Sequence, residues 1–246
     1  MRAGAFSAAP GRYPIGGRSR SSIRRRLLRD ISSVLIISGL LLLADAGVTL
    51  VWQEPLTAVI GLIRRAQIDQ RFLSYRSAPL SAVERRSLQA LASVDQRIVY
   101  LARHEQHVVD IGDAVGRIAI PRIGASFIVV QGTDEGSLQK GPGHYPTTAL
   151  PGLGQTVAIA GHRTTYLAPF RNIDQLRPGD RITVRMPYGS FVYTVQYHRI
   201  VAPNAWWITS NVGYERLVLS ACNPLYSAAQ RIVVFARLAY FRSLAG

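Results

Sequence analysis

The sequence has one cysteine, Cys222, one lysine and only 14 acidic residues among its 246. A single cysteine rules out a disulfide within the chain and any zinc site built from several thiolates. Because acids are scarce and 29 residues are lysine or arginine, the formal charge is +15 at pH 7. Hydrophobic residues make up 48% and charged residues 17% of the chain, which excludes a mostly disordered protein.

The excess of positive charge does not indicate a nucleic-acid-binding protein. Residues 1–30 hold eight arginines against the single acid Asp30, which gives +7 there. The remaining +8 is spread thinly over more than two hundred positions. The sequence shows no basic helix face, no zinc-ligand set and no interleaved aromatic and arginine residues, so nucleic acid is not an expected partner.

The basic segment is followed by a long apolar run, residues 31–52. Its length is close to the roughly 20 residues that a helix needs to cross a bilayer. Ala44-Asp45-Ala46 also resembles a signal-peptidase site, so a cleaved signal peptide is the alternative. We favour an uncleaved anchor, because the apolar run continues to Trp52, a residue suited to the interface. The positive-inside rule then places residues 1–30 in the cytoplasm and the chain after 52 outside the cell membrane.

Residues 53–112 have the composition of a helical stalk or linker. Apolar residues at three- and four-residue intervals predict helices over 63–77 and 80–109. Ser81 is placed to cap the second helix, and Glu84, three residues later, completes a capping box.

From residue 113 to 246 the pattern changes to short β-type runs separated by glycine and proline. Seven or eight closely spaced strands favour one antiparallel or mixed β-barrel over a βαβ sheet. The expected strands are GRIAIPRI, SFIVVQG, TVAIAGHR, DRITVRMP, SFVYTVQYHRIV, ERLVLSAC and QRIVVFARLAY.

Two of these strands end on reactive side chains, His162 and Cys222, and Arg231 begins the next strand. A thiolate nucleophile, an imidazole that donates a proton to a leaving amine and a permanently charged guanidinium beside the oxyanion together suffice for acyl transfer. A lone cysteine is usually a small buried apolar residue. An unpaired thiol in an exported protein risks oxidation, however, which favours a functional role for Cys222.

In these stretches the sequence resembles the sortases, membrane-anchored cysteine transpeptidases of Gram-positive cell surfaces. The resemblance covers about 112–240 and is carried by GRIAIPRIG, GTDEGSLQKGPGHYPTTALPG, VAIAGHRTTY, LRPGD and LVLSACNPLYSAAQRIVV. It implies an eight-stranded β-barrel with His162, Cys222 and Arg231 as catalytic residues and no cofactor. It further implies cleavage of a Leu-Pro-x-Thr-Gly-like sorting signal between Thr and Gly and transfer to an amine of a cell-wall precursor or a pilin.

The segments ADAGVTLVWQEP and CNPLYSAAQR are similar to actinobacterial class E sortases, which favour Leu-Ala-x-Thr-Gly signals. The family often has Thr-Leu-x-Thr-Cys, whereas this chain ends the strand with Ser220-Ala221-Cys222. Ala221 therefore replaces a hydroxyl that can help to position the substrate, so Ala221 is assigned to the substrate site.

The loop before that strand predicts the remaining features of the site. Between residues 202 and 216 its only acid is Glu215, so no metal is expected, unlike in the calcium-using sortases. Trp206 and Trp207 are expected to line a groove for an apolar signal peptide. His144 follows a glycine–proline turn, a setting that favours a structural hydrogen bond over catalysis.

Two other functions remain open at this point. An exported cysteine hydrolase would use the same residues and give the acyl group to water. A cell-surface binding barrel would leave Cys222 inert.

Overall fold

The computed structural model describes residues 20–51, 59–63, 66 and 80–243. The chain divides into two compact units at Leu50, and helix α1, Arg20–Val51, belongs to the first of them except for its last residue. Its segment Arg25–Val48 has 24 residues, is long and apolar enough to cross a membrane, and has no part buried within the protein. The helix expected over 63–77 lies, except for two residues, outside the described part of the chain.

Helix α3, Ala82–Ala90, begins with the predicted capping box. The Ser81 hydroxyl accepts a hydrogen bond from the Glu84 N–H, and the Glu84 carboxylate accepts one from the Ser81 N–H. Each bond satisfies an N–H group that the first helical turn would leave without a partner.

The prediction of one helix over 80–109 is wrong, because the chain breaks and starts a second helix, α4, at Val94–Val108. Ser93 and Gln96 form a second capping box at this start. Since serine competes well for the backbone at a helix N-terminus, it favours a new helix over continuation of the old one.

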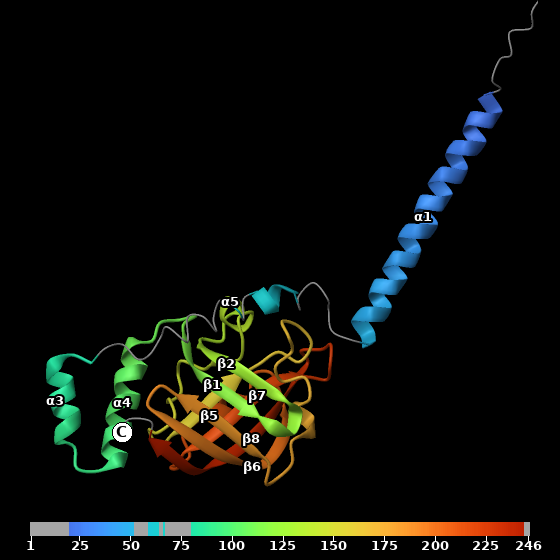
Figure 1. The fold of residues 1–246 in the computed structure, drawn as a ribbon. Helices are drawn as coiled ribbons and strands as arrows, with labels where there is room; N and C mark the ends of the chain where they lie inside the picture. The colour runs from blue at the N-terminus through green and yellow to red at the C-terminus, as the bar shows by residue number, and fades with distance from the viewer. Residues whose placement is uncertain (1–19, 52–58, 64–65, 67–79, 244–246) are drawn as a thin grey trace, which may run out of the picture. The chain divides into compact units, whose positions relative to one another are not determined.

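Helix α4 packs against the barrel (Figure 1). Its Ile98 and Ala102 are almost fully buried and belong to the main hydrophobic core. We did not predict this contact between α4 and the barrel from the sequence, because helical spacing over 53–112 indicated only a stalk or linker.

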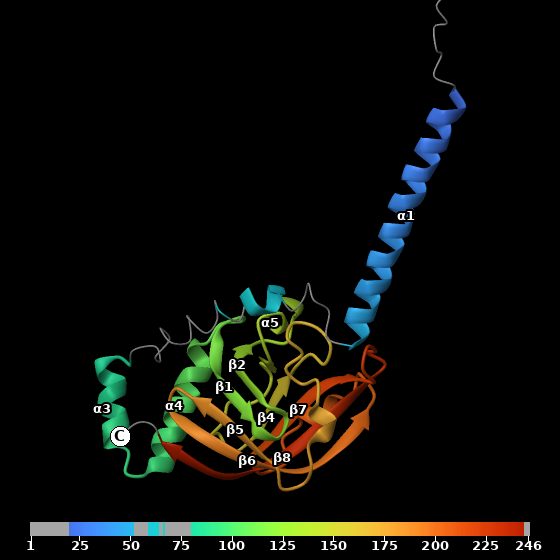
Figure 2. The same cartoon turned by 45° about the vertical axis from the view of Figure 1, so that its right-hand side comes forward.

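Eight strands close into one barrel in the order β1-β2-β3-β4-β7-β8-β6-β5, which confirms the expected mainly β fold (Figure 2). The β2–β3 and β4–β7 pairs are parallel and the other pairs are antiparallel. The strands are β1 (Ala114–Ile120), β2 (Ala125–Gln131), β3 (Gly143–His144), β4 (Thr156–Ala160), β5 (Arg181–Met186), β6 (Gly189–Val201), β7 (Arg216–Asn223) and β8 (Gln230–Ser243). Short helices connect them: η1 (Pro121–Ile123), α5 (Glu135–Leu138), η2 (Ile173–Gln175) and η3 (Trp206–Thr209). The two-residue β3 is the strand that was not among the predicted runs.

The sheet has an inner and an outer apolar face near β7. Leu219 and Ala221 belong to the main core, whereas Val218 belongs to a second cluster. Because strand side chains alternate between the two faces, Cys222 lies on the same face as Val218, opposite the core. We call this second group the outer cluster; its buried members are Ala158, Ile208, Val218, Val233 and Phe235.

Candidate active site

Cys222 and Arg231 lie opposite each other on neighbouring antiparallel strands. Cys222 is the last but one residue of β7, and its register partner on β8 is Arg231. Directly opposed residues of an antiparallel pair have Cβ atoms roughly 4.5–5.5 Å apart. Cys222 and Arg231 are nine residues apart in the sequence, which is the length that brings β8 back to a position opposite the thiol.

The parallel pairing of β4 with β7 directs His162 to the same end of the outer face. The last pair in register is Ala160 with Ser220, and the Gly161 N–H still donates to the Ser220 carbonyl at 3.0 Å. His162 and Cys222 each follow two residues after that pair. Figure 2 shows β4 and β7 side by side with this common direction.

The His162 imidazole is partly buried. Its ring centroid lies 5.4 Å from that of Tyr166, and its Nε2 atom is enclosed and accepts or donates no hydrogen bond among the described residues. Burial lowers the pKa of His162 below the usual value, and the charge of Glu135 opposes this shift. The ring is therefore mainly neutral at pH 7 and able to take up a proton.

Arg231 is half-buried and fixed by its own turn. Its Nη1 donates to the Ala228 carbonyl at 2.8 Å and to the Gln230 carbonyl at 2.9 Å. Both bonds use Nη1, and a guanidinium carries further N–H groups on Nε and Nη2. Cys222 is a free thiol of intermediate exposure.

Trp207 extends the outer face beside these groups. Its ring stacks on Phe235 with 6.0 Å between centroids, and Tyr197 of β6 stacks on Phe235 at 4.8 Å. Trp207 is 47% exposed and Trp206 is 79% exposed, so both present aromatic surface to solvent. Their proposed contact with a signal peptide stays a prediction.

Ala221 faces the other way. Its side chain is 2% exposed and packs in the main core, on the face of β7 opposite Cys222. Any contact of Ala221 with a substrate would have to come from its main chain.

Arg216 holds the loop that carries the tryptophans, and the sequence pattern did not identify it. Its buried Nη2 donates to the carbonyls of Ile208 at 3.1 Å and Ser210 at 2.9 Å, and its Nε donates to the Thr156 hydroxyl at 3.1 Å. The guanidinium also lies over the Phe235 ring, 5.3 Å from its centroid.

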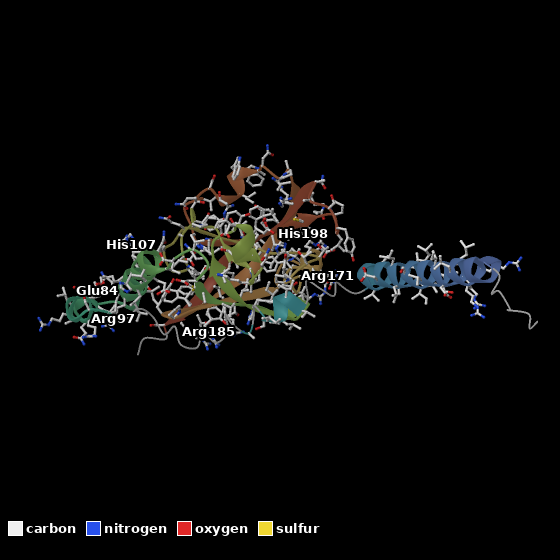
Figure 3. All side chains as sticks on the ribbon, turned by 90° about the horizontal axis from the view of Figure 1, so that it is seen from above. Glu84, Arg97, His107, Arg171, Arg185 and His198 are labelled. Carbon is white, nitrogen blue, oxygen red and sulfur yellow. The ribbon has the colours of Figure 1, made fainter. Side chains whose placement is uncertain are left out.

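The His144 ring forms its hydrogen bonds with other residues than these and is 1% exposed. Its Nδ1 is 2.8 Å from Gln131 Oε1 and its Nε2 is 3.0 Å from the Ala149 carbonyl. Both ring nitrogens thus have protein partners, as expected of a structural histidine. His198, labelled in Figure 3, is exposed on β6.

Glu215, the one acid of the loop, is buried in a separate network. It accepts hydrogen bonds from the Gly152 and Gly154 N–H groups and from the Tyr193 hydroxyl. Burial raises the pKa of Glu215, while these bonds oppose the rise. Among the residues that the structure describes, no three His, Cys, Asp or Glu side chains group as metal ligands.

Comparison with known proteins identifies the family. Residues 118–239 match the model of the Sortase domain. This chain belongs to the sortase family. It is 32% identical over 130 residues to Sortase D of Bacillus subtilis (strain 168), which covers 51% of this chain and 64% of that protein. The chain spans less than two thirds of the curated sortases it matches.

Solved sortase structures share the barrel. Sortase E1 of Streptomyces coelicolor, crystallised with a tripeptide in its active site, is 25% identical with a TM-score of 0.52 over 54% of this chain and 91% of that one. Sortase E of Streptomyces avermitilis is 29% identical with a TM-score of 0.51, over 55% and 93% respectively. Relatives named for types D and E both match, so the class E assignment stays a prediction.

Proposed function

We propose that this sortase is a cysteine transpeptidase whose catalytic residues are Cys222, His162 and Arg231. The observation that supports this most strongly is the register of β7 with β8, which sets the only thiol opposite a guanidinium. The parallel β4–β7 pair supports the inclusion of His162.

The acylation step uses the three side chains in turn. The thiol proton of Cys222 passes to His162, and the thiolate attacks the threonine carbonyl of a Leu-Pro-x-Thr-Gly-like or Leu-Ala-x-Thr-Gly-like signal. Arg231 donates hydrogen bonds to the oxyanion. The Thr–Gly bond breaks, His162 protonates the leaving glycine amine, and the Thr carbonyl remains on Cys222 as a thioester.

The second step transfers the acyl group to an amine. A cell-wall precursor or pilin amine attacks the thioester, and His162 accepts the proton of that amine. The new amide is released, and Cys222 returns to the thiolate form. Water in place of the amine would give hydrolysis instead. The partition therefore depends on how well the groove holds the amine.

The proposed location is the cell membrane, with α1 as a single-pass anchor. The arginines before residue 31 favour a cytoplasmic N-terminus and an extracellular barrel. In this arrangement the active site meets surface proteins after they cross the membrane, which suits substrates with C-terminal sorting signals.

Incubation of the full chain in detergent with a sorting-signal peptide and an excess of an amine, followed by mass spectrometry, tests the proposal. We expect a peptide–amine adduct joined at threonine. A peptide fragment that ends in a free threonine carboxylate, with no amine adduct, would identify a hydrolase. No cleavage, with Cys222 unreactive to an alkylating agent, would favour a binding barrel.

A further inference from the structure

The main-chain ladder between β4 and β7 stops just before the candidate catalytic residues. Its last bond is from the Gly161 N–H to the Ser220 carbonyl. A loop begins at His162. The His162 carbonyl accepts a hydrogen bond from the Phe170 N–H of this loop at 3.0 Å. No main-chain bond of the ladder therefore fixes His162 directly against Cys222.

The side chain of Arg163 spans this gap. It is 4% exposed, and its Nη1 donates to the Cys222 carbonyl at 3.4 Å and to Asn223 Oδ1 at 3.1 Å. Its Nη2 pairs with Asp174 at 3.0 Å, and its Nε donates to the Arg171 carbonyl at 3.2 Å. One guanidinium thus joins the backbone next to His162 to the residue that carries the thiol.

The same network reaches the strand of Arg231. The Asn223 amide donates to Gln230 Oε1 at 3.2 Å, and these two residues are register partners adjacent to the Cys222–Arg231 pair. Figure 3 shows Arg171, whose carbonyl Arg163 holds, on the side of the barrel away from the α4 residue His107.

We propose that Arg163 is a positioning residue that fixes His162 in register with Cys222 and Arg231. This inference rests on the proposed function. Because Arg163 follows His162 directly in the chain, its anchored side chain limits how far the His162 backbone can move from β7. A displacement of about 1 Å at a catalytic group can lower a rate by about 100-fold.

The chemistry of the contacts requires arginine. The guanidinium presents N–H groups in three directions at once, toward the acid, the carbonyls and the amide oxygen. A lysine ammonium would keep the charge but could not span all of these partners from one rigid plane. Arg163→Lys therefore keeps the positive charge of the network and removes its hydrogen-bond geometry, so the variant tests the geometry alone.

The test measures kcat and KM for a sorting-signal peptide with the full chain in detergent. We expect Arg163→Lys to lower kcat about tenfold and Arg163→Met about 100-fold, with KM within about threefold of wild type. Arg216→Met is the matched control, because it also removes a buried arginine, and there KM should rise more than kcat falls. Assays run well below the melting temperature of each variant, so that unfolding does not contribute.

A second measurement does not depend on peptide turnover. The rate at which iodoacetamide alkylates Cys222 against pH reports the thiolate population. In Arg163→Lys the midpoint should move upward by about half a pH unit or more, because the imidazole that takes up the thiol proton is no longer held beside the thiol. Asn223→Ala, which removes one partner without burying an unpaired cation, should give a smaller shift in the same direction.

Either of two results would overturn the positioning role. One is a folded Arg163→Lys or Asn223→Ala protein with unchanged kcat and an unchanged alkylation profile. The other is a loss of activity that simply follows the unfolded fraction. If wild type fails to cleave any signal peptide, the proposed function fails, and the alkylation profiles still decide whether Arg163 holds His162 near the thiol.

Discussion

His162 is the residue whose assignment depends most on the parallel β4–β7 pair. We expect His162→Ala to lower kcat for peptide cleavage by roughly 10²–10⁴-fold, because the leaving amine loses its proton donor. His198→Ala is the control, since that histidine is exposed on β6. Steady-state kinetics with both variants decide the matter; equal activities of the two would remove His162 from the mechanism.

His144 should make the barrel less stable in acid. Burial lowers its pKa from 6.5 to about 4, so folding favours the neutral ring. Protonation then favours the unfolded chain, and the stabilisation present above pH 6.5 is lost as pH falls toward 4. We expect the free energy of unfolding to drop by about 2 kcal/mol between pH 7 and pH 5 from this group.

Urea unfolding of the full chain in detergent at the two pH values measures this difference. His144→Gln keeps hydrogen-bonding capacity and cannot titrate in this range, so its pH dependence should be smaller by that amount. If the free energy of unfolding falls equally between the two pH values in wild type and in His144→Gln, the acid sensitivity belongs to other groups.

For single residues, the sequence predicts the reactive side chains that follow an apolar strand. It does not predict residues whose hydrogen-bond partners are distant in the sequence. His162 and Cys222 follow apolar runs, which marks them directly. Arg163 and Arg216 are two of 28 arginines, and their role depends on carbonyls and hydroxyls brought together only by the fold. No local pattern distinguishes them from solvated arginines.

Helix η3 and its loop form the element that we expect to control substrate affinity. Trp207→Ala removes the ring that stacks on Phe235 and exposes the outer cluster. We expect KM for the signal peptide to rise about tenfold with kcat nearly unchanged, because the loss is of binding surface and not of reacting groups. Trp206→Ala, which removes the more exposed neighbour, is the comparison.

Peptide titrations of both variants measure the effect. A fall in kcat without a change in KM for Trp207→Ala would show that the loop acts on the chemistry instead. An unchanged KM in both variants would exclude the loop aromatics from the substrate site.

Most elements follow from local sequence, and the exceptions have physical causes. Seven of the eight strands are apolar runs separated by glycine and proline, so the barrel is predictable in outline. β3 has only Gly143 and His144, which is too short for any alternation. The break between α3 and α4 was missed because helix-type spacing continues through Ser93, whose capping preference decides the outcome.

The whole molecule combines an apolar helix with a barrel, and α1 should retain it in the membrane fraction. Replacing Leu41 and Leu42 by arginine places two charges mid-segment, each costing roughly 2.5–3.5 kcal/mol on insertion scales. We expect this variant to be lost from carbonate-washed membranes, whereas the paired change of both leucines to alanine should remain. Wild type in the soluble fraction would contradict the anchor.

The central claim, that Cys222 carries the acyl group between donor and acceptor, is tested most directly by the intact mass of the full chain. The protein is mixed with signal peptide alone and quenched in acid. We predict a mass increase equal to the fragment that ends in threonine less one water, as a thioester requires, located on Cys222 by peptide mapping, absent in Cys222→Ala and discharged by added amine. Cleavage of the peptide by Cys222→Ala, or turnover by wild type with the fragment bound elsewhere, would contradict the account.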